Sequence, residues 1–195
     1  IILNFFASVA MIWGQDNPSL LQMAVPSLNI APDARGGGMG DMGAATLPDI
    51  NSQYWNAAKY AFMGSKAGVS LSYTPWLRKL VNDVALVNMT GYYKLGNSDL
   101  QAISASLRYF SLGEVNIWEN IGDVPYGLNP YEMAFDVAYS RKLSESYSMA
   151  VTLRYIRSDM GTDQNDESNA GNAFSADISG YLEKYVLMGN AEALW

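Results

Sequence analysis

The sequence predicts an all-β fold, a transmembrane antiparallel β-barrel, on three observations. From residue 66 onward, apolar and polar residues alternate with a period of two, which is typical of strands whose two faces meet different surroundings. Most of the alternating runs span about nine to eleven residues, the length that a tilted strand needs to cross a bilayer. Long and short connections also alternate along the chain, as they do between the two rims of an outer-membrane barrel.

Six strands are expected between residues 66 and 195, with a seventh beginning near Tyr185. The six runs lie at 68–74, 84–93, 102–110, 132–142, 147–157 and 174–182. The connections at 94–99 and 142–146 are tight and polar, whereas those at 75–83, 111–131 and 158–172 are long. Tyr and Trp residues fall near the strand ends, where a barrel carries its aromatic girdles. Since a closed bacterial barrel needs at least about eight strands, we expect this chain to be a piece of a longer barrel.

Four charged residues fall on the polar faces of these strands and are therefore expected to face the lumen of a barrel: Arg108, Asp136, Arg154 and Asp177. Ionisable residues at membrane depth are functional candidates by default. In a water-filled barrel, however, solvation of the lumen and anchoring of a plug are the favoured roles, with opposite charges pairing with each other or with the plug.

Composition excludes several classes of function. The chain has 12 Lys and Arg against 19 Asp and Glu, a net charge of -7 that disfavours a nucleic-acid partner. It has no Cys and no His, which removes Ser-His and Cys-His catalytic pairs and most transition-metal sites. The acidic loop at 158–172 resembles a calcium loop only weakly, because it lacks the fixed Gly and terminal Glu of an EF-hand. We therefore expect no catalytic residue, no metal and no cofactor.

The chain opens on an uncharged apolar run from Ile1 to Trp13, followed by Gly14. This length suits the hydrophobic region of a secretory signal peptide and is too short for a membrane-spanning helix. Residues 1–15 are therefore interpreted as the remnant of a signal peptide in a chain truncated at its N-terminus, with a buried strand or helix as the alternative. Residues 16–65 precede the first strand, and residues 66–195 form the incomplete barrel.

A glycine-rich stretch in residues 16–65 predicts a compact, irregular hatch that folds inside the lumen. Its backbone is freed by glycine, and its charges can anchor it to the wall. The hatch residues singled out are Asp33, Arg35, Gly36, Gly38, Gly40 and Asp41. A phosphate-binding loop is rejected, because no strand precedes the glycines and no Gly-Lys-Ser/Thr ending follows them.

Several blocks of sequence closely resemble one known family. They include NIAPDARGGGMGDMGAAT (29–46), SQYWNAAKYAF (52–62), SLSYTPWLRKLVND (70–83), SASLRYFSLGEV (104–115) and AGNAFSADIS (170–179). Together they resemble the PorV family of outer-membrane proteins in the Bacteroidota type IX secretion system, which is itself similar to the FadL fatty-acid transporters. The resemblance extends from about Ala24 to Ser179, with small departures at Tyr54 and Ala57 that affect no catalytic role.

The resemblance implies a FadL-like barrel of about fourteen strands with an N-terminal hatch, in the bacterial outer membrane and in contact with its lipid. By that count, this chain is roughly the N-terminal half of the barrel. It also implies a role without catalysis. Such proteins carry secreted cargo by its C-terminal signal domain from the type IX translocon to a cell-surface attachment complex containing a sortase-like enzyme. Two other functions stay open from the residues: a FadL-like channel for hydrophobic small molecules, and an outer-membrane lipid-modifying enzyme.

The longest connection, residues 111–131, is the candidate partner-binding loop. It combines acidic residues with an unusual number of apolar ones, of which Trp118, Ile121 and Tyr126 are the expected anchors. Exposed apolar patches mark protein contacts, and Trp and Tyr often dominate the energy of such contacts. The alternative is that the loop folds inward and caps the lumen.

Overall fold

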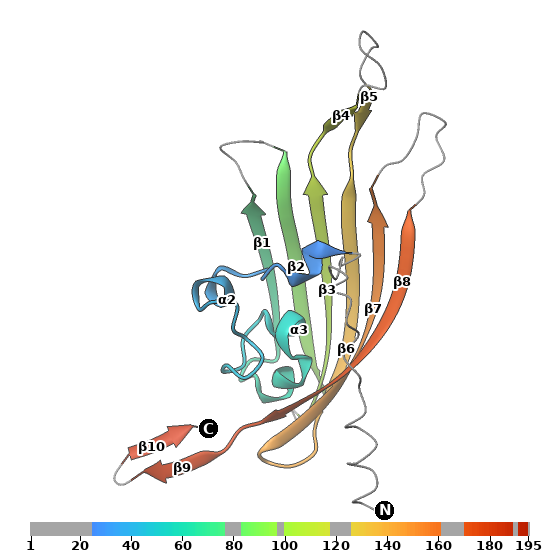
Figure 1. The fold of residues 1–195 in the computed structure, drawn as a ribbon. Coiled ribbons are helices and arrows are strands. Elements are labelled where there is room, and N and C mark those ends of the chain that lie inside the picture. The colour runs from blue at the N-terminus through green and yellow to red at the C-terminus, as the bar shows by residue number, and fades with distance from the viewer. Residues whose placement is uncertain are drawn as a thin grey trace, which may run out of the picture.

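The protein is described here from a computed structural model that covers residues 25–76, 83–96, 100–117, 126–160, 170–188 and 191–194. Its main element is an antiparallel sheet of six strands in the order β1-β2-β3-β6-β7-β8 (Figure 1). The strands are β1 (Ala67–Pro75), β2 (Val84–Leu95), β3 (Gln101–Leu112), β6 (Tyr131–Lys142), β7 (Tyr147–Asp159) and β8 (Gly171–Leu182). All six strands expected from the alternating pattern are therefore confirmed.

Each strand of this sheet pairs with the strand that follows it along the sheet, in an unbroken antiparallel register. The short β2–β3 and β6–β7 connections consequently share one end of the sheet. The longer β1–β2, β3–β6 and β7–β8 connections share the other end (Figure 1). The alternation of long and short connections that the sequence predicts is thus found in the fold.

Two small hairpins lie outside the six-stranded sheet and correct two expectations. The long connection 111–131 is not all loop, because β4 (Val115–Ile117) pairs with β5 (Tyr126–Leu128). The expected seventh strand does begin at Tyr185, as β9 (Tyr185–Met188). It pairs with β10 (Ala191–Leu194) and does not extend the main sheet. Alternation alone could not show which strand would be the partner.

Residues 25–66, called the N-terminal segment below, cross one face of the sheet and reach past its β1 edge (Figure 1). They form two 3-10 helices, η1 (Pro26–Asn29) and η2 (Ala57–Phe62), and two short α-helices, α2 (Ala34–Gly38) and α3 (Ser52–Trp55). The glycine-rich stretch was expected to be irregular throughout. It contains α2, because the side chain of Asp33 caps that helix by accepting a hydrogen bond from the Gly36 amide at 2.7 Å.

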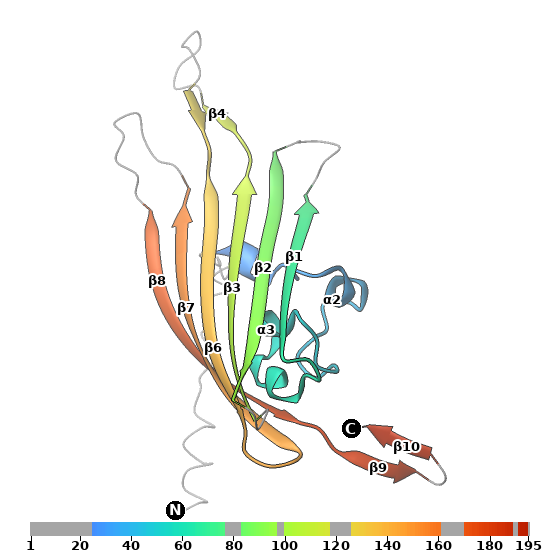
Figure 2. The same ribbon diagram turned by 180° about the vertical axis from the view of Figure 1, so that it is seen from behind.

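The two faces of the sheet have the opposite arrangement to that of a soluble protein. The face toward the N-terminal segment, called the polar face, carries Ser, Thr, Asn, Arg and Asp, and it buries Arg108 and Asp136 to 5% and 6% exposure. The other face, called the apolar face, has no part of the N-terminal segment over it (Figure 2). Large hydrophobic side chains there are bare, with Val69 at 70% and Leu153 at 63% exposure. Such an extended apolar surface marks an interaction with protein or lipid.

Aromatic residues on the apolar face gather toward the two ends of the strands. Tyr73 and Tyr109 lie toward the end with the long connections, and Tyr93 and Tyr139 lie toward the other end. Two further Tyr residues expected in these girdles lie instead on the polar face: Tyr92 and Tyr181, at 5% and 7% exposure. Both residues were assigned to the girdles only because they lie near a strand end. The face on which a side chain lies is decided by the alternation along the strand, in which every second residue points to the same side. Among the described residues, no helix is long and apolar enough to cross a membrane.

The hydrophobic core lies between η2 and the polar face. Ala58, Tyr60 and Ala61 of η2 are fully buried, and η2 contacts β3, β6, β7 and β8. The ring of Tyr60 stacks on that of Tyr92 at 4.9 Å between centroids, and the Ser148 hydroxyl donates a hydrogen bond to the Ala58 carbonyl at 2.7 Å. Small alanines let the backbone of η2 approach the sheet closely, which fixes residues 57–62 as the best-packed part of the N-terminal segment.

Candidate functional site

The candidate site is the interface between the N-terminal segment and the polar face, where the predicted hatch residues and strand charges meet. At one end, two charged strand residues hold the backbone of Ser27 in η1. The Ser27 amide donates to Glu132 Oε2 at 3.0 Å, and Arg108 Nη1 donates to the Ser27 carbonyl at 3.0 Å. Both side chains are buried, so each of these hydrogen bonds acts in a medium of low dielectric constant.

Arg108 also contacts the N-terminal segment through an aromatic ring. Its guanidinium lies 4.4 Å from the centroid of the Tyr54 ring, and the Tyr54 hydroxyl donates to the Leu28 carbonyl at 3.0 Å. A guanidinium over an aromatic face is attracted by the ring quadrupole. Arg108 therefore ties η1 and α3 together at the polar face.

A second group of charges runs across β6, β7 and β8. Arg154 Nε donates to Asp136 Oδ1 at 2.6 Å, and Arg154 Nη1 lies 3.7 Å from Asp177 Oδ2. The Ser106 hydroxyl donates to Asp136 Oδ2 at 3.1 Å. Three of the four strand charges predicted from the sequence thus pair with one another, whereas Arg108 binds the N-terminal segment.

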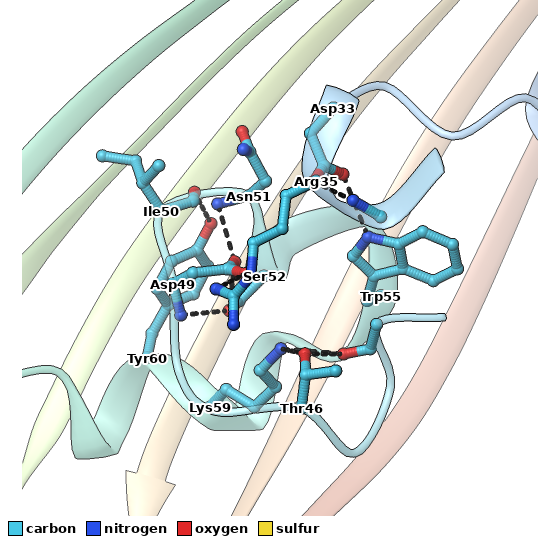
Figure 3. Close-up of polar contacts among 12 residues, drawn as sticks. Asp33, Arg35, Thr46, Asp49, Ile50, Asn51, Ser52, Trp55, Lys59 and Tyr60 are labelled. Carbon is cyan, nitrogen blue, oxygen red and sulfur yellow. Dashed lines mark hydrogen bonds and ion pairs between the residues drawn. The ribbon is translucent and has the colours of Figure 1, made fainter. Parts of the chain in front are cut away.

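Within the N-terminal segment, Asp33 links α2 to α3. Its carboxylate caps α2 through Gly36 and accepts a hydrogen bond from Trp55 Nε1 at 3.2 Å (Figure 3). The Trp55 ring lies so close to the backbone that a Cβ atom added to Gly36 or Gly43 would come within 2.8 Å or 2.3 Å of it. These two glycines are therefore required by packing against Trp55 and not by backbone conformation.

Arg35 and Asp49 close the loop between α2 and α3. Arg35 Nη1 lies 3.1 Å from Asp49 Oδ2 at the surface (Figure 3). Asp49 Oδ1 also accepts hydrogen bonds from the Asn51 amide at 3.0 Å and the Ser52 hydroxyl at 3.1 Å. Asp49 thus organises the start of α3, while its exposed ion pair with Arg35 adds little stability.

Lys59 also holds the loop between α2 and α3. Its ammonium is fully buried and donates to the Gly43 carbonyl at 2.8 Å and to the Thr46 hydroxyl at 3.1 Å (Figure 3). Burial lowers the pKa of Lys59 from its usual 10.5, and the nearby Asp49 carboxylate opposes this shift. Burial also raises the pKa of the neighbouring Tyr60 hydroxyl, which donates to the Ile50 carbonyl at 2.8 Å.

These shifts predict a pH dependence for docking of the N-terminal segment. Because the docked form binds the Lys59 proton more weakly than the released form, docking strengthens as pH rises toward 10.5. Tyr60 contributes the opposite trend only above its ordinary pKa of 10, because its docked pKa is raised. Hydrogen exchange of the peptide 56–62, corrected for intrinsic rates, should show greater protection at pH 10, just below the ordinary pKa of Lys59, than at pH 8. The variant Lys59→Met should lose this difference, and an unchanged difference in that variant would contradict the assignment to Lys59.

The remaining hatch residues have weaker contacts than expected. Gly38 ends α2 with open space around its Cα, Gly40 takes a φ of 77°, and Asp41 is exposed at a φ of 58°. A positive φ is a conformation that glycine adopts without strain, so Gly40 fits the turn after α2. Of the six hatch residues singled out from the sequence, Asp33, Arg35 and Gly36 make the specific side-chain or packing contacts.

Residues 118–125 of the candidate partner-binding loop, which include Trp118 and Ile121, lie outside the described residues. The predicted signal peptide at residues 1–15 also lies outside them. Tyr126 begins β5, where its backbone pairs with that of Ile117. Only this backbone pairing can be added to the prediction.

Sequence reasoning missed five residues that hold the N-terminal segment together or join it to the sheet: Gln53, Trp55, Lys59, Tyr60 and Glu132. Gln53 Oε1 accepts a hydrogen bond from Ser104 at 2.5 Å, within a helix that carried no alternating pattern. Glu132 lies near the start of β6, an even number of residues before Asp136, so both side chains lie on the same face of the sheet. That alternation could have predicted Glu132 from the sequence. No group of three or more potential metal ligands occurs in the described part of the chain.

Comparison with known protein families identifies the chain. The family model for the type IX secretion system protein PorV matches residues 14–192, which is nearly the whole chain. In a direct comparison, no curated protein matches the sequence. The family match places the protein in the outer membrane. The chain belongs to the PorV family of the type IX secretion system.

Proposed function

We propose that this chain forms part of the wall of a closed outer-membrane barrel that carries secreted proteins between complexes of the type IX system. The observation that supports the barrel is the reversal of the two faces. Polar and charged side chains are buried against the N-terminal segment, while Leu, Val, Ile and Phe side chains are bare on the other face. A transmembrane barrel has this arrangement, with lipid outside and polar groups inside.

Closure of the barrel is supported by the edges of the sheet. Among the described residues, β1 and β8 each have a strand on one side only, so their outer backbone groups lack sheet partners there. Such groups cost several kcal/mol each in hydrocarbon, so the strands at membrane depth need to be paired on both sides. In this proposal, further strands pair with β1 and β8 to give about fourteen in all, and residues 25–66 act as the hatch in the lumen.

The hatch argues against a channel for hydrophobic small molecules. The face toward the lumen carries Ser, Thr, Asn, Arg and Asp side chains, and those of Ser104, Arg108 and Glu132 are engaged by the N-terminal segment. An apolar ligand needs a pocket lined mainly by apolar groups. The face offers instead a polar surface to which the hatch is hydrogen-bonded. A lipid-modifying enzyme is equally unsupported, since the chain has no His to pair with a Ser nucleophile.

The family match and the proposed closed barrel support a role in the transport of folded cargo. With its lumen occupied, the protein can carry a folded partner on its surface without threading it through the barrel. The partners proposed are the C-terminal signal domains of secreted proteins, the type IX translocon and the sortase-like attachment complex. The contacts are assigned to the rim with the long connections, which we place outside the cell.

Affinity capture tests this function most simply. The full-length protein, tagged and purified from outer membranes in mild detergent, should bring with it secreted proteins that carry C-terminal signal domains. The same cargo should be lost in a strain whose cargo lacks that domain. Recovery of the translocon without any cargo would contradict the shuttle and favour a fixed structural role.

A double substitution tests the contact loop. Changing Trp118 and Ile121 to Ser should reduce cargo secretion by about tenfold or more, because aromatic and aliphatic anchors commonly contribute 2 kcal/mol or more to binding. Heat-modifiable migration of the barrel on gels should be unchanged, which separates loss of contact from loss of folding. Normal secretion by this variant would move the contact surface to the connections at 76–83 or 160–170.

A further inference from the structure

The apolar face has a hollow of about 510 Å³ at its centre, across β2 and β3. Gly91 and Ala105 form its floor, and they are directly paired in the register of the two strands. With one side chain absent and the other a methyl group, the surface is lower here than on either side. The hollow therefore has a definite place and a definite cause in the sequence.

Bulky side chains surround this floor on every side. Along the strands, Met89, Leu107 and Phe135 line one side, and Tyr93 and Ile103 line the other. Val69 of β1 and Val137 of β6 lie at the two ends. The hollow is thus a groove across the middle of the sheet.

The groove offers almost no polar group to a ligand. Ser104 and Ser106 contribute to its lining, but their side chains are on the polar face, where they donate to Gln53 and to Asp136. A peptide backbone placed in the groove would leave its N–H and C=O groups without partners. A methylene chain has no such requirement, and it can follow an irregular groove because its bonds rotate freely.

We propose that this groove binds one acyl chain of an outer-membrane phospholipid. The inference rests on the proposed barrel, in which the apolar face meets the bilayer. Gly91 is the eighth of twelve residues in β2 and Ala105 is the fifth of twelve in β3, so the groove lies at the depth of the hydrocarbon. The membrane supplies acyl chains there at high concentration, and a chain seated in the groove gains dispersion contacts with its floor and walls that a flat surface does not provide.

Photo-crosslinking of lipid to the full-length protein tests this proposal. The protein is reconstituted in vesicles of phosphatidylethanolamine and phosphatidylglycerol that contain a phosphatidylethanolamine with a diazirine in its acyl chain. After irradiation, adducts are mapped by mass spectrometry. Adducts at Val69, Leu107 and Val137 should exceed those at Leu153, an exposed residue of the same face, by about fivefold, which corresponds to about 1 kcal/mol of preference.

The variant Gly91→Leu fills the groove. A Cβ atom at Gly91 has ordinary contacts, the nearest being Gly68 O and Val69 Cγ2 at 3.6 Å, so the substitution should not prevent folding. It should reduce the adducts at Leu107 and Val137 to the level at Leu153. The matched control is Ala176→Leu, which adds the same side chain outside the groove. Ala176 is level with Val137 in the strand register but lies two strands away, on β8. This control should leave the adducts in the groove unchanged.

The possible outcomes distinguish this inference from the proposed function. Equal adducts over the whole apolar face, unaffected by Gly91→Leu, would show ordinary boundary lipid and overturn the acyl-chain site alone. Strong adducts at Leu153 with few in the groove would show that something other than lipid occupies it, and would also overturn the proposal. A complete lack of adducts on the apolar face would contradict the barrel itself.

Discussion

Replacing Gly43 by Val should release the N-terminal segment from the sheet. The added Cβ atom would lie 2.3 Å from Trp55 ring atoms, a distance that requires the indole or the backbone to move. Overpacking of this kind costs about 1–3 kcal/mol. Movement of Gly43 also weakens the hydrogen bond that the buried Lys59 ammonium donates to the Gly43 carbonyl. A poorly paired buried cation would then add to the cost.

Trypsin cleavage after Lys59 measures this effect, because Lys59 is fully buried while the segment is docked. We expect cleavage to be at least about tenfold faster in Gly43→Val than in the natural protein, since proteolysis follows the population of the open form. Gly38→Val is the matched control, because a Cβ atom there meets nothing within 4 Å. Equal cleavage rates in the two variants would mean that Trp55 does not restrict Gly43.

Replacing Asp136 by Ala should destabilise the sheet itself. Asp136 accepts hydrogen bonds from Arg154 at 2.6 Å and from Ser106 at 3.1 Å. Its removal would leave Arg154 with the 3.7 Å contact to the exposed Asp177. Removing one member of a buried ion pair typically costs about 3–5 kcal/mol, and partial exposure of Arg154 places the expected cost near the lower end.

The temperature at which the barrel loses its heat-modifiable migration on gels measures this cost. Asp136→Ala should lower it by several degrees, and Asp136→Asn should lower it less because an amide oxygen still accepts from Arg154. The second substitution Arg154→Met, added to Asp136→Ala, should restore part of the loss by removing the unpaired cation. Additive losses in the double variant would show that the two residues do not act as a pair.

Strand positions and the two faces could be predicted from the sequence, because alternation is a local signal that survives in any sheet with different surroundings on its two sides. The pairing of Asp136 with Arg154 also follows from parity once neighbouring strands are assigned. The partner of Arg108 does not follow, since it is a backbone carbonyl of Ser27, 81 residues earlier in the chain. Such contacts depend on the path of an irregular segment, whose sequence has no periodic pattern from which that path could be predicted.

The glycine-rich stretch illustrates the same limit. Its glycines were singled out for backbone freedom, and that reason applies to Gly40, whose φ is 77°. Gly36 is needed for a different reason, the nearness of the Trp55 ring, and Gly43 shares that reason although it was not singled out for it. Contact with a distant side chain is invisible to a rule based on local conformation, so the packing requirement at Gly43 could not be predicted from the sequence.

The central claim is that the apolar face meets lipid while the polar face holds the N-terminal segment. Single Cys residues carrying a nitroxide label test it directly, and the chain contains no Cys of its own. Labels would be placed in turn at positions 149–153 of β7 in the full-length protein reconstituted in vesicles. The account predicts that oxygen accelerates relaxation most at Met149, Val151 and Leu153, and that both oxygen and a water-soluble nickel complex have weak effects at Ala150 and Thr152. The reverse pattern, or strong access of the nickel complex to Val151 and Leu153, would contradict it.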